Sequence, residues 1–234
     1  MILPPAEQLD RAVQERVTKQ RYLHSVGVRD TAVLLAERYG CDTAKAACAA
    51  LLHDVARDLP LETMQSIVTM QRIVKTNPDV VKFSGSDPEN RICTDDRPGG
   101  PASDPPGNRE GCPIDDNVFH SRGLLHARAG RVIACSDFGI EDENVLRSIE
   151  LHTTGAAKMT VLDKVVFVAD YIEPNRHFPG LRTARKIARR NLDEAVLHIF
   201  REVLRTLVNK NAYICRNTIL GYNELVRCRE ALSL

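Results

Sequence analysis

The stretch Ala46-Ala47-Cys48-Ala49-Ala50-Leu51-Leu52-His53-Asp54 decides the fold and points to a functional site. Its first seven residues are apolar without interruption, which is typical of a helix buried on all sides. The imidazole of His53 and the carboxylate of Asp54 follow directly, and burying both is costly unless something compensates them. A bound cation does so, because neutral imidazole and ionised carboxylate are ready metal ligands. The alternative is a core histidine that is hydrogen-bonded to a neighbouring acid.

Four further groups of the same chemical types occur in helical or apolar surroundings. They are His24 in an expected helix, His126 after two leucines, His152 at an expected helix end, and Asp170 within the apolar run 165–172. Any one of these histidines could be an ordinary core residue, whereas a lone carboxylate in an apolar run is expensive. Six such groups, in a chain with seven histidines, make a metal centre the favoured interpretation.

The spacing of apolar residues predicts helices over most of the chain. The expected ranges are roughly 6–20, 22–39, 42–57, 60–75, 118–137, 141–152, 159–172, 180–208 and 217–231. Asn191, followed by Leu192 and two acidic residues, predicts a break within 180–208 and the start of a new helix. No alternating strand pattern occurs. We therefore predict an all-α fold, a helical bundle around the six groups, with residues 1–234 forming one domain.

Residues 82–117 differ from the rest of the chain in composition. They hold six of the 12 prolines and five of the 13 glycines, and they contain few apolar side chains. Such a segment cannot form a helix interior and has little to bury. We expect a disordered insert, with a lid over the site as the alternative.

The overall composition is that of an ordinary intracellular protein. Lys and Arg number 32 against 31 Asp and Glu, a formal charge of +1, so no global field favours nucleic acid or a membrane surface. No apolar run reaches 18 residues, and the first residues lack the basic and apolar parts of a secretory signal. The seven cysteines show no paired spacing, which suits free thiols in the cytoplasm.

The sequence motifs around the six groups resemble those of a known family. They are Arg21-Tyr22-x-His24-Ser25-x-Gly27-Val28, Leu52-His53-Asp54-x-Ala56-Arg57, Leu125-His126-Ala127, His152-Thr153-Thr154-Gly155 and Val168-Ala169-Asp170-Tyr171-Ile172-Glu173-Pro174-Asn175-Arg176-x-Phe178-Pro179-Gly180. The order of the six groups along the chain resembles that of the HD superfamily of metal-dependent phosphohydrolases. The last motif, from Val168 to Gly180, is similar to that of the symmetrical bis(5'-nucleosyl)-tetraphosphatases. The resemblance implies cleavage of diadenosine tetraphosphate into two ADP by attack of a metal-bound water on an inner phosphate. It covers nearly the whole chain except the insert, which is longer than the family leads us to expect.

The resemblance also implies a ligand set. It places a divalent metal on His24, His53, Asp54 and Asp170, with iron as the family's metal and manganese, cobalt or zinc as alternatives. Asp54 and Asp170 would also be catalytic, together with His126 and His152. For these two histidines we favour contacts to phosphate, and a second metal site is the alternative.

Further residues are expected to bind the substrate. Three arginines lie within the family motifs, namely Arg21, Arg57 and Arg176. The planar guanidinium group of arginine suits phosphate oxygens. His24, Thr153 and Asp170 are expected beside the phosphates, and Tyr213 beside the nucleotide. The later basic run consists of Arg182, Arg185, Lys186, Arg189 and Arg190. It is expected to be mostly solvated helix surface, with an electrostatic funnel or a nucleic-acid patch as alternatives.

Three classes of function remain open at this stage. The first is the symmetrical tetraphosphatase, the second an HD hydrolase of another nucleotide, and the third a non-catalytic protein that binds a nucleotide or alarmone. The motif from Asp170 to Gly180 argues against the second, and the presence of all six groups argues against the third. The expected partner is a small dinucleoside polyphosphate rather than a membrane or nucleic acid. A homodimer is one option for the assembly.

Overall fold

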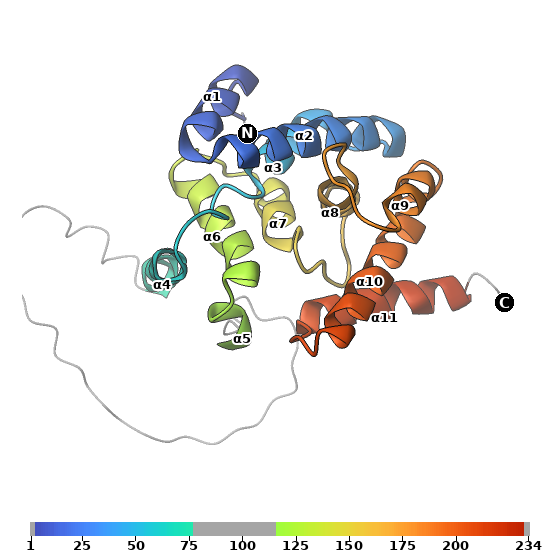
Figure 1. Ribbon diagram of the computed structural model, residues 1–234. Helices are drawn as coiled ribbons and strands as arrows, with labels where there is room; N and C mark the ends of the chain where they lie inside the picture. Colours follow the sequence, from blue (N-terminus) through green and yellow to red (C-terminus); the bar gives the residue numbers. More distant parts are fainter. Residues whose placement is uncertain (1–2, 77–115, 232–234) are drawn as a thin grey trace, which may run out of the picture.

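The computed structural model describes residues 3–76 and 116–231, and every regular element in these two ranges is a helix (Figure 1). The predicted all-α fold is therefore confirmed. The expectation of disorder for residues 82–115 lies outside the described residues. Asp116 and Asn117, the last two residues of the expected insert, instead begin a short helix. No described helix is long and apolar enough to cross a membrane.

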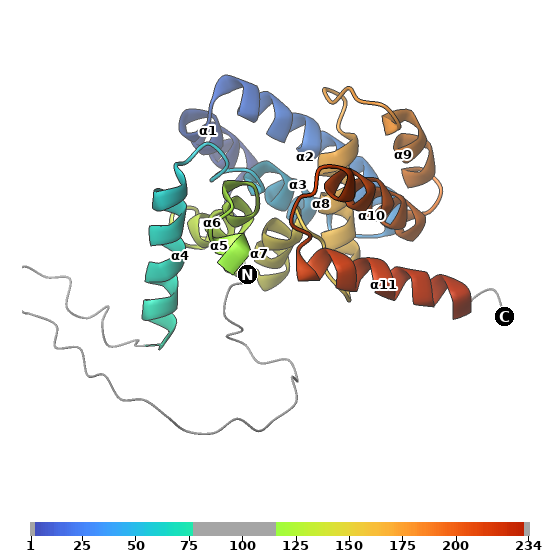
Figure 2. The ribbon, with the colours of Figure 1, turned by 60° about the horizontal axis from the view of Figure 1, so that its bottom comes forward.

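The helices follow the order expected from the apolar spacing, except that the expected helix 118–137 is interrupted at His120 and Ser121. They are α1 (Ala6–Arg16), α2 (Lys19–Tyr39), α3 (Thr43–Leu52), α4 (Leu61–Thr76), α5 (Asp116–Phe119), α6 (Arg122–Ser136), α7 (Glu143–Leu151), α8 (Val161–Ile172), α9 (Leu181–Ala188), α10 (Leu192–Asn209) and α11 (Arg216–Ala231). The predicted break at Asn191 is confirmed, because the Asn191 side chain caps α10 by accepting from Glu194 N. In Figure 2, α4 stands on one side of the molecule and α9 to α11 on the other.

The apolar stretch 46–52 forms the centre of the bundle. Helix α3 packs against α2, α7 and α8, and Ala46, Ala49, Ala50 and Leu52 are completely buried. Alanine side chains allow the neighbouring helices to approach closely, while burying Leu52 contributes about 2 kcal/mol to stability. The helix was predicted to continue to residue 57, and this boundary is wrong. It ends at Leu52, and successive turns follow in which Val55 N donates to Leu52 O and Arg57 N to Asp54 O.

Side-chain caps fix the starts of two helices that lead to the centre. Asp142 begins α7 by accepting from Asn144 N and Val145 N. Thr160 and Asp163 form a reciprocal capping box at the start of α8. Such caps satisfy backbone donors that a helix leaves without partners. They therefore set the register of the helices whose far ends reach His152 and Asp170.

Helix α11 lies close to the loop that follows His152. Thr218 Oγ1 donates to Thr154 O at 2.8 Å, and Gly221 lies against the backbone of Ala156. A Cβ atom on Gly221 would come within 2.7 Å of Ala156 O and within 2.7 Å of Phe200 Cζ. The absence of a side chain at position 221 therefore permits this contact.

We predict that Gly221→Ala lowers the free energy of unfolding by about 1–3 kcal/mol, because the added methyl group overpacks the interface between α11 and the loop. Gly123→Ala is the matched control, since the nearest atom to its added Cβ is Ser121 Oγ at 3.7 Å. The control should raise stability by up to about 1 kcal/mol through helix propensity. Urea denaturation measures both. Equal stabilisation by the two changes would contradict the close packing at Gly221.

Candidate metal centre

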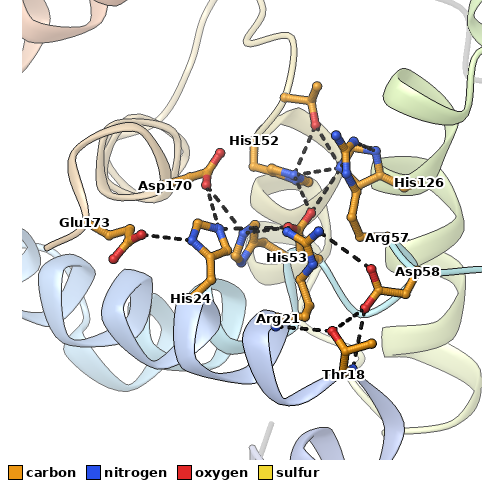
Figure 3. Close-up of polar contacts among 12 residues, drawn as sticks. Thr18, Arg21, His24, His53, Arg57, Asp58, His126, His152, Asp170 and Glu173 are labelled. Atoms are coloured by element: carbon orange, nitrogen blue, oxygen red, sulfur yellow. Dashed lines mark hydrogen bonds and ion pairs between the residues drawn. The ribbon is translucent and has the colours of Figure 1, made fainter. Parts of the chain in front are cut away.

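The six groups singled out in the sequence lie together at the centre of the bundle (Figure 3). His53 and Asp54 follow the end of α3, His152 follows α7, and His24, His126 and Asp170 project from α2, α6 and α8. His53 is completely buried, and Asp54, His126 and His152 are at most 5% exposed. The turn after Leu52 brings adjacent residues, His53 and Asp54, into the same centre. Five helices therefore contribute to one buried polar cluster.

Four donor atoms form the first half of the centre. His24 Nε2 lies 3.0 Å from Asp170 Oδ1 and 3.9 Å from Asp54 Oδ2. His53 Nε2 lies 3.6 Å from each of the same two oxygens. Atoms that bind one cation at about 2.0–2.2 Å must lie within twice that distance of one another, and these pairs do. His24, His53 and Asp170 form one group at ligand spacing, and Asp54 falls in a second group with His53 and His152.

Hydrogen bonds on the far side of the rings settle which nitrogens face the centre as acceptors. His53 Nδ1 lies 2.6 Å from Ala50 O, and His152 Nδ1 lies 2.7 Å from Ile149 O. A carbonyl oxygen only accepts, so each Nδ1 carries a proton and the neutral ring presents the Nε2 lone pair to the centre. His24 makes the same kind of contact through Nδ1, 3.1 Å from Glu173 Oε1.

Two buried histidine nitrogens of the centre are left without hydrogen bonds. Neither His24 Nε2 nor His53 Nε2 has a hydrogen-bond partner among the described residues, although carboxylate oxygens of Asp54 and Asp170 lie nearby. Lone pairs and ionised oxygens at this distance repel one another unless positive charge lies between them. The donor set therefore fits a divalent cation, and nitrogen with oxygen ligands suits a first-row transition metal.

The charges of the centre agree with this reading. Burial raises the pKa of Asp54, but His53, His126 and His152 lower it further, so it falls well below its usual value. Burial likewise opposes ionisation of Asp170, and His24, His53 and Arg176 hold its pKa well below the ordinary range. Burial lowers the pKa of His24, yet Asp170 and Glu173 outweigh it and the net shift is upward. Two ionised carboxylates thus attract positive charge to the first half of the centre.

The second half of the centre lies on the other oxygen of Asp54. Asp54 Oδ1 is 3.2 Å from His126 Nε2 and 3.5 Å from His152 Nε2, which are themselves 3.1 Å apart. Thr153 Oγ1 lies within 3.2 Å of both nitrogens. Burial, His152 and Arg57 lower the pKa of His126 to about 4 against the influence of Asp54. His126 is therefore neutral near pH 7.

Three arginines expected to bind phosphate lie at the edge of the centre. Arg21 Nη1 is 2.6 Å from Asp54 Oδ2, and Arg176 Nη2 is 2.5 Å from Asp170 Oδ1. Arg57 Nη1 lies 2.8 Å from Nδ1 and 3.3 Å from Nε2 of His126, so it faces the ring rather than one lone pair. All three positive charges thus border the cluster.

Tyr213 is placed apart from these groups in the chain. It lies on the loop between α10 and α11 and is 42% exposed. Its role beside the nucleotide stays a prediction.

Two acidic residues with a part in the site were not singled out in the sequence. Glu173, only 2% exposed, accepts from His24 through Oε1 and from Asn175 N through Oε2. A Cβ on Gly27 would come within 2.6 Å of Glu173 Oε2, so glycine leaves room for this carboxylate. Asp58 lies 3.6 Å from Arg21 and accepts from Thr18 Oγ1. An acid directly before Pro174, at the end of an apolar helix, was the available signal for Glu173.

Comparisons with known proteins agree with this geometry. Residues 21–85 match the HD domain family. A symmetrical bis(5'-nucleosyl)-tetraphosphatase from Bacillus subtilis (strain 168) is 34% identical over 94% of this chain and 97% of that protein. The protein of the same name from Staphylococcus aureus (strain NCTC 8325 / PS 47) is 30% identical over 91% and 90%. A crystal structure of a Clostridium acetobutylicum protein, described as a predicted HD superfamily hydrolase involved in NAD metabolism, is 32% identical with a TM-score of 0.76 over 97% of this chain and 99% of that one.

The fold is thus that of an HD-domain hydrolase. Within that class, the chain belongs to the family of symmetrical bis(5'-nucleosyl)-tetraphosphatases. The resemblance read from the sequence is confirmed.

We predict that Glu173→Gln weakens metal binding about tenfold to hundredfold, the usual effect of losing a group that orients a histidine ligand. The amide has one acceptor oxygen where the carboxylate has two, so it cannot serve both His24 and Asn175. Glu150→Gln is the control, because Glu150 pairs with Arg128 and Arg131 away from the centre. Calorimetric titration with Mn²⁺ measures both affinities. An unchanged affinity of the Glu173 variant would contradict the orienting contact.

Proposed function

We propose that this chain is a metal-dependent hydrolase that cleaves diadenosine tetraphosphate symmetrically into two ADP. The observation that carries the proposal is the convergence of all six groups in a chain that matches symmetrical tetraphosphatases over more than nine-tenths of its length. The two alternatives, hydrolysis of another nucleotide and binding without catalysis, are less well supported. A binding protein would not need two ionised carboxylates facing histidine lone pairs.

The proposed cofactor is one divalent metal ion held by His24, His53, Asp54 and Asp170, with iron as the first candidate. The two nitrogens without hydrogen-bond partners and the depressed carboxyl pKa values support this choice of ligands. When bound, such an ion lowers the pKa of a coordinated water towards neutrality and polarises a phosphoryl oxygen. Manganese, cobalt and zinc are alternatives with the same preference for mixed ligands.

The protein side chains would bind and orient the tetraphosphate. Formation of two ADP requires water to attack an inner phosphorus atom while the other ADP leaves in line. We propose that Arg21, Arg57 and Arg176 neutralise the phosphate oxygens, because all three border the cluster. The contacts of these arginines to Asp54, Asp170 and His126 hold the guanidinium groups at the centre.

His126 and Thr153 are the proposed hydrogen-bond donors to phosphate. The hydroxyl of Thr153 lies beside both histidines, and His126 is neutral near pH 7, so either can donate without adding charge. His152 is less suited to this role than we expected, since its proton is engaged by Ile149 O and its free nitrogen accepts. A donor aimed at developing charge in the transition state is a strong catalytic device.

Several wider expectations remain proposals. Tyr213 would line the nucleotide pocket, residues 1–234 would form one domain, and the protein would work in the cytoplasm. The substrate is the proposed partner, and a homodimer remains one option for the assembly.

We predict that iron-loaded protein, prepared without oxygen, converts diadenosine tetraphosphate into ADP alone. Asp54→Ala should lose both the metal and turnover, because Asp54 contacts both halves of the centre. Chromatography of the products and metal analysis of both proteins provide the measurement. Formation of ATP and AMP would refute attack at the inner phosphate. A variant that keeps full metal content would show that Asp54 is not a ligand.

Metal counting tests the roles of the remaining histidines. If His126 and Thr153 contact phosphate, we expect one ion per chain after dialysis, and His152→Ala should leave that stoichiometry unchanged while lowering turnover. Plasma mass spectrometry gives the count. Two ions per chain, reduced to one by His152→Ala, would instead assign His126 and His152, with Asp54 Oδ1 beside them, to a second metal site.

A further inference from the structure

The turn after α8 controls two contacts to the proposed metal ligands. Helix α8 ends at Ile172, and Glu173 leaves the helical conformation with φ −51° and ψ 152° before Pro174, because a residue that precedes proline disfavours the helical region. Within this turn, the Glu173 side chain contacts His24 and the Arg176 side chain contacts Asp170. A shift of the turn would therefore disturb ligands on two helices at once.

One side chain from another helix binds the backbone of this turn. Arg185, in α9, donates from Nε to Ile172 O at 2.8 Å and from Nη2 to Glu173 O at 2.6 Å. Its Nη2 also lies 3.4 Å from Arg176 O. The carbonyl groups at the end of a helix have no partners within the helix, and a cation there also interacts favourably with the helix dipole. Arg185 thus ties the last residue of α8 to both ends of the turn.

The basic run 182–190 is mostly exposed, as expected, and Arg185 is the exception. Arg182, Lys186, Arg189 and Arg190 are exposed, whereas Arg185 is half-buried and its guanidinium faces α8. The planar fork of arginine supplies several donors in fixed directions, so one side chain can hold three carbonyl groups. The ammonium group of lysine is a single point charge and cannot reproduce the pattern.

We infer that Arg185 is a positioning residue of the metal centre. It fixes the turn 173–176 so that Glu173 orients His24 and Arg176 holds Asp170. The hydrogen bonds of Arg185 in the described part of the chain go to the backbone carbonyls of Ile172, Glu173 and Arg176, so it would act through the backbone. The inference rests on the metal site in the proposed function, but it does not depend on which phosphate is attacked.

The test compares Arg185→Gln, Arg185→Lys and the control Arg182→Gln, an exposed arginine of the same helix. Each protein is titrated with Co²⁺ without substrate, and the visible absorption of the bound ion reports both affinity and ligand geometry. The unfolding temperature of each metal-free protein is measured in parallel. We expect Arg185→Gln to weaken Co²⁺ binding about tenfold to hundredfold and to change the spectrum. Arg185→Lys should recover part of the affinity, and Arg182→Gln should match the original protein.

A purely structural role would lower the unfolding temperature of Arg185→Gln and leave the affinity and spectrum of Co²⁺ unchanged. That result would overturn the inference. If Arg185→Gln does not fold, the lysine variant decides: an unaltered affinity and spectrum overturn the inference, and weaker binding with an altered spectrum supports it. An original protein that binds no Co²⁺ would overturn it as well. Formation of ATP and AMP from the substrate would refute only the proposed function.

Discussion

The contact of one buried carboxylate with two pairs of histidines is the constraint on which the structure depends. Asp54 directs Oδ2 towards His24 and His53, and Oδ1 towards His126 and His152. An ionised carboxylate in this position is expensive unless positive charge surrounds it. Arg21 supplies part of that charge, and the two nitrogens without hydrogen-bond partners indicate where a cation would supply the rest.

The fold brings the ligand side chains together because three helices end at the centre. α3 stops one residue before His53, α7 stops one residue before His152, and Asp170 lies in the last turn of α8. Groups at helix ends can converge without forcing the helix axes together, while alanines in α3 allow close packing elsewhere. The backbone carbonyls of Ala50 and Ile149 then orient the two histidines at these ends. Secondary structure and ligand orientation therefore have the same local cause.

Much of this arrangement followed from the sequence, because apolar spacing reports burial directly. The central helix, the break at Asn191 and the meeting of the six groups were predicted from neighbouring residues alone or from the family resemblance. The end of α3 at Leu52 was not predicted, because the apolar residues that follow Leu52 continue the spacing of a helix. The parts played by Glu173 and Arg185 were also missed, because they depend on contacts between residues distant in the chain or on backbone carbonyls. Sequence patterns carry no direct record of such contacts.

The most direct test of the central claim is anomalous diffraction from crystals of the protein grown with Mn²⁺ under reducing conditions. The account predicts an anomalous peak bounded by His24 Nε2, His53 Nε2, Asp54 Oδ2 and Asp170 Oδ1, about 2.0–2.2 Å from each. Such a peak would place the cation where the structure leaves lone pairs facing carboxylate oxygens. A peak confined to His126 and His152, or no peak within the cluster at millimolar Mn²⁺, would contradict the account.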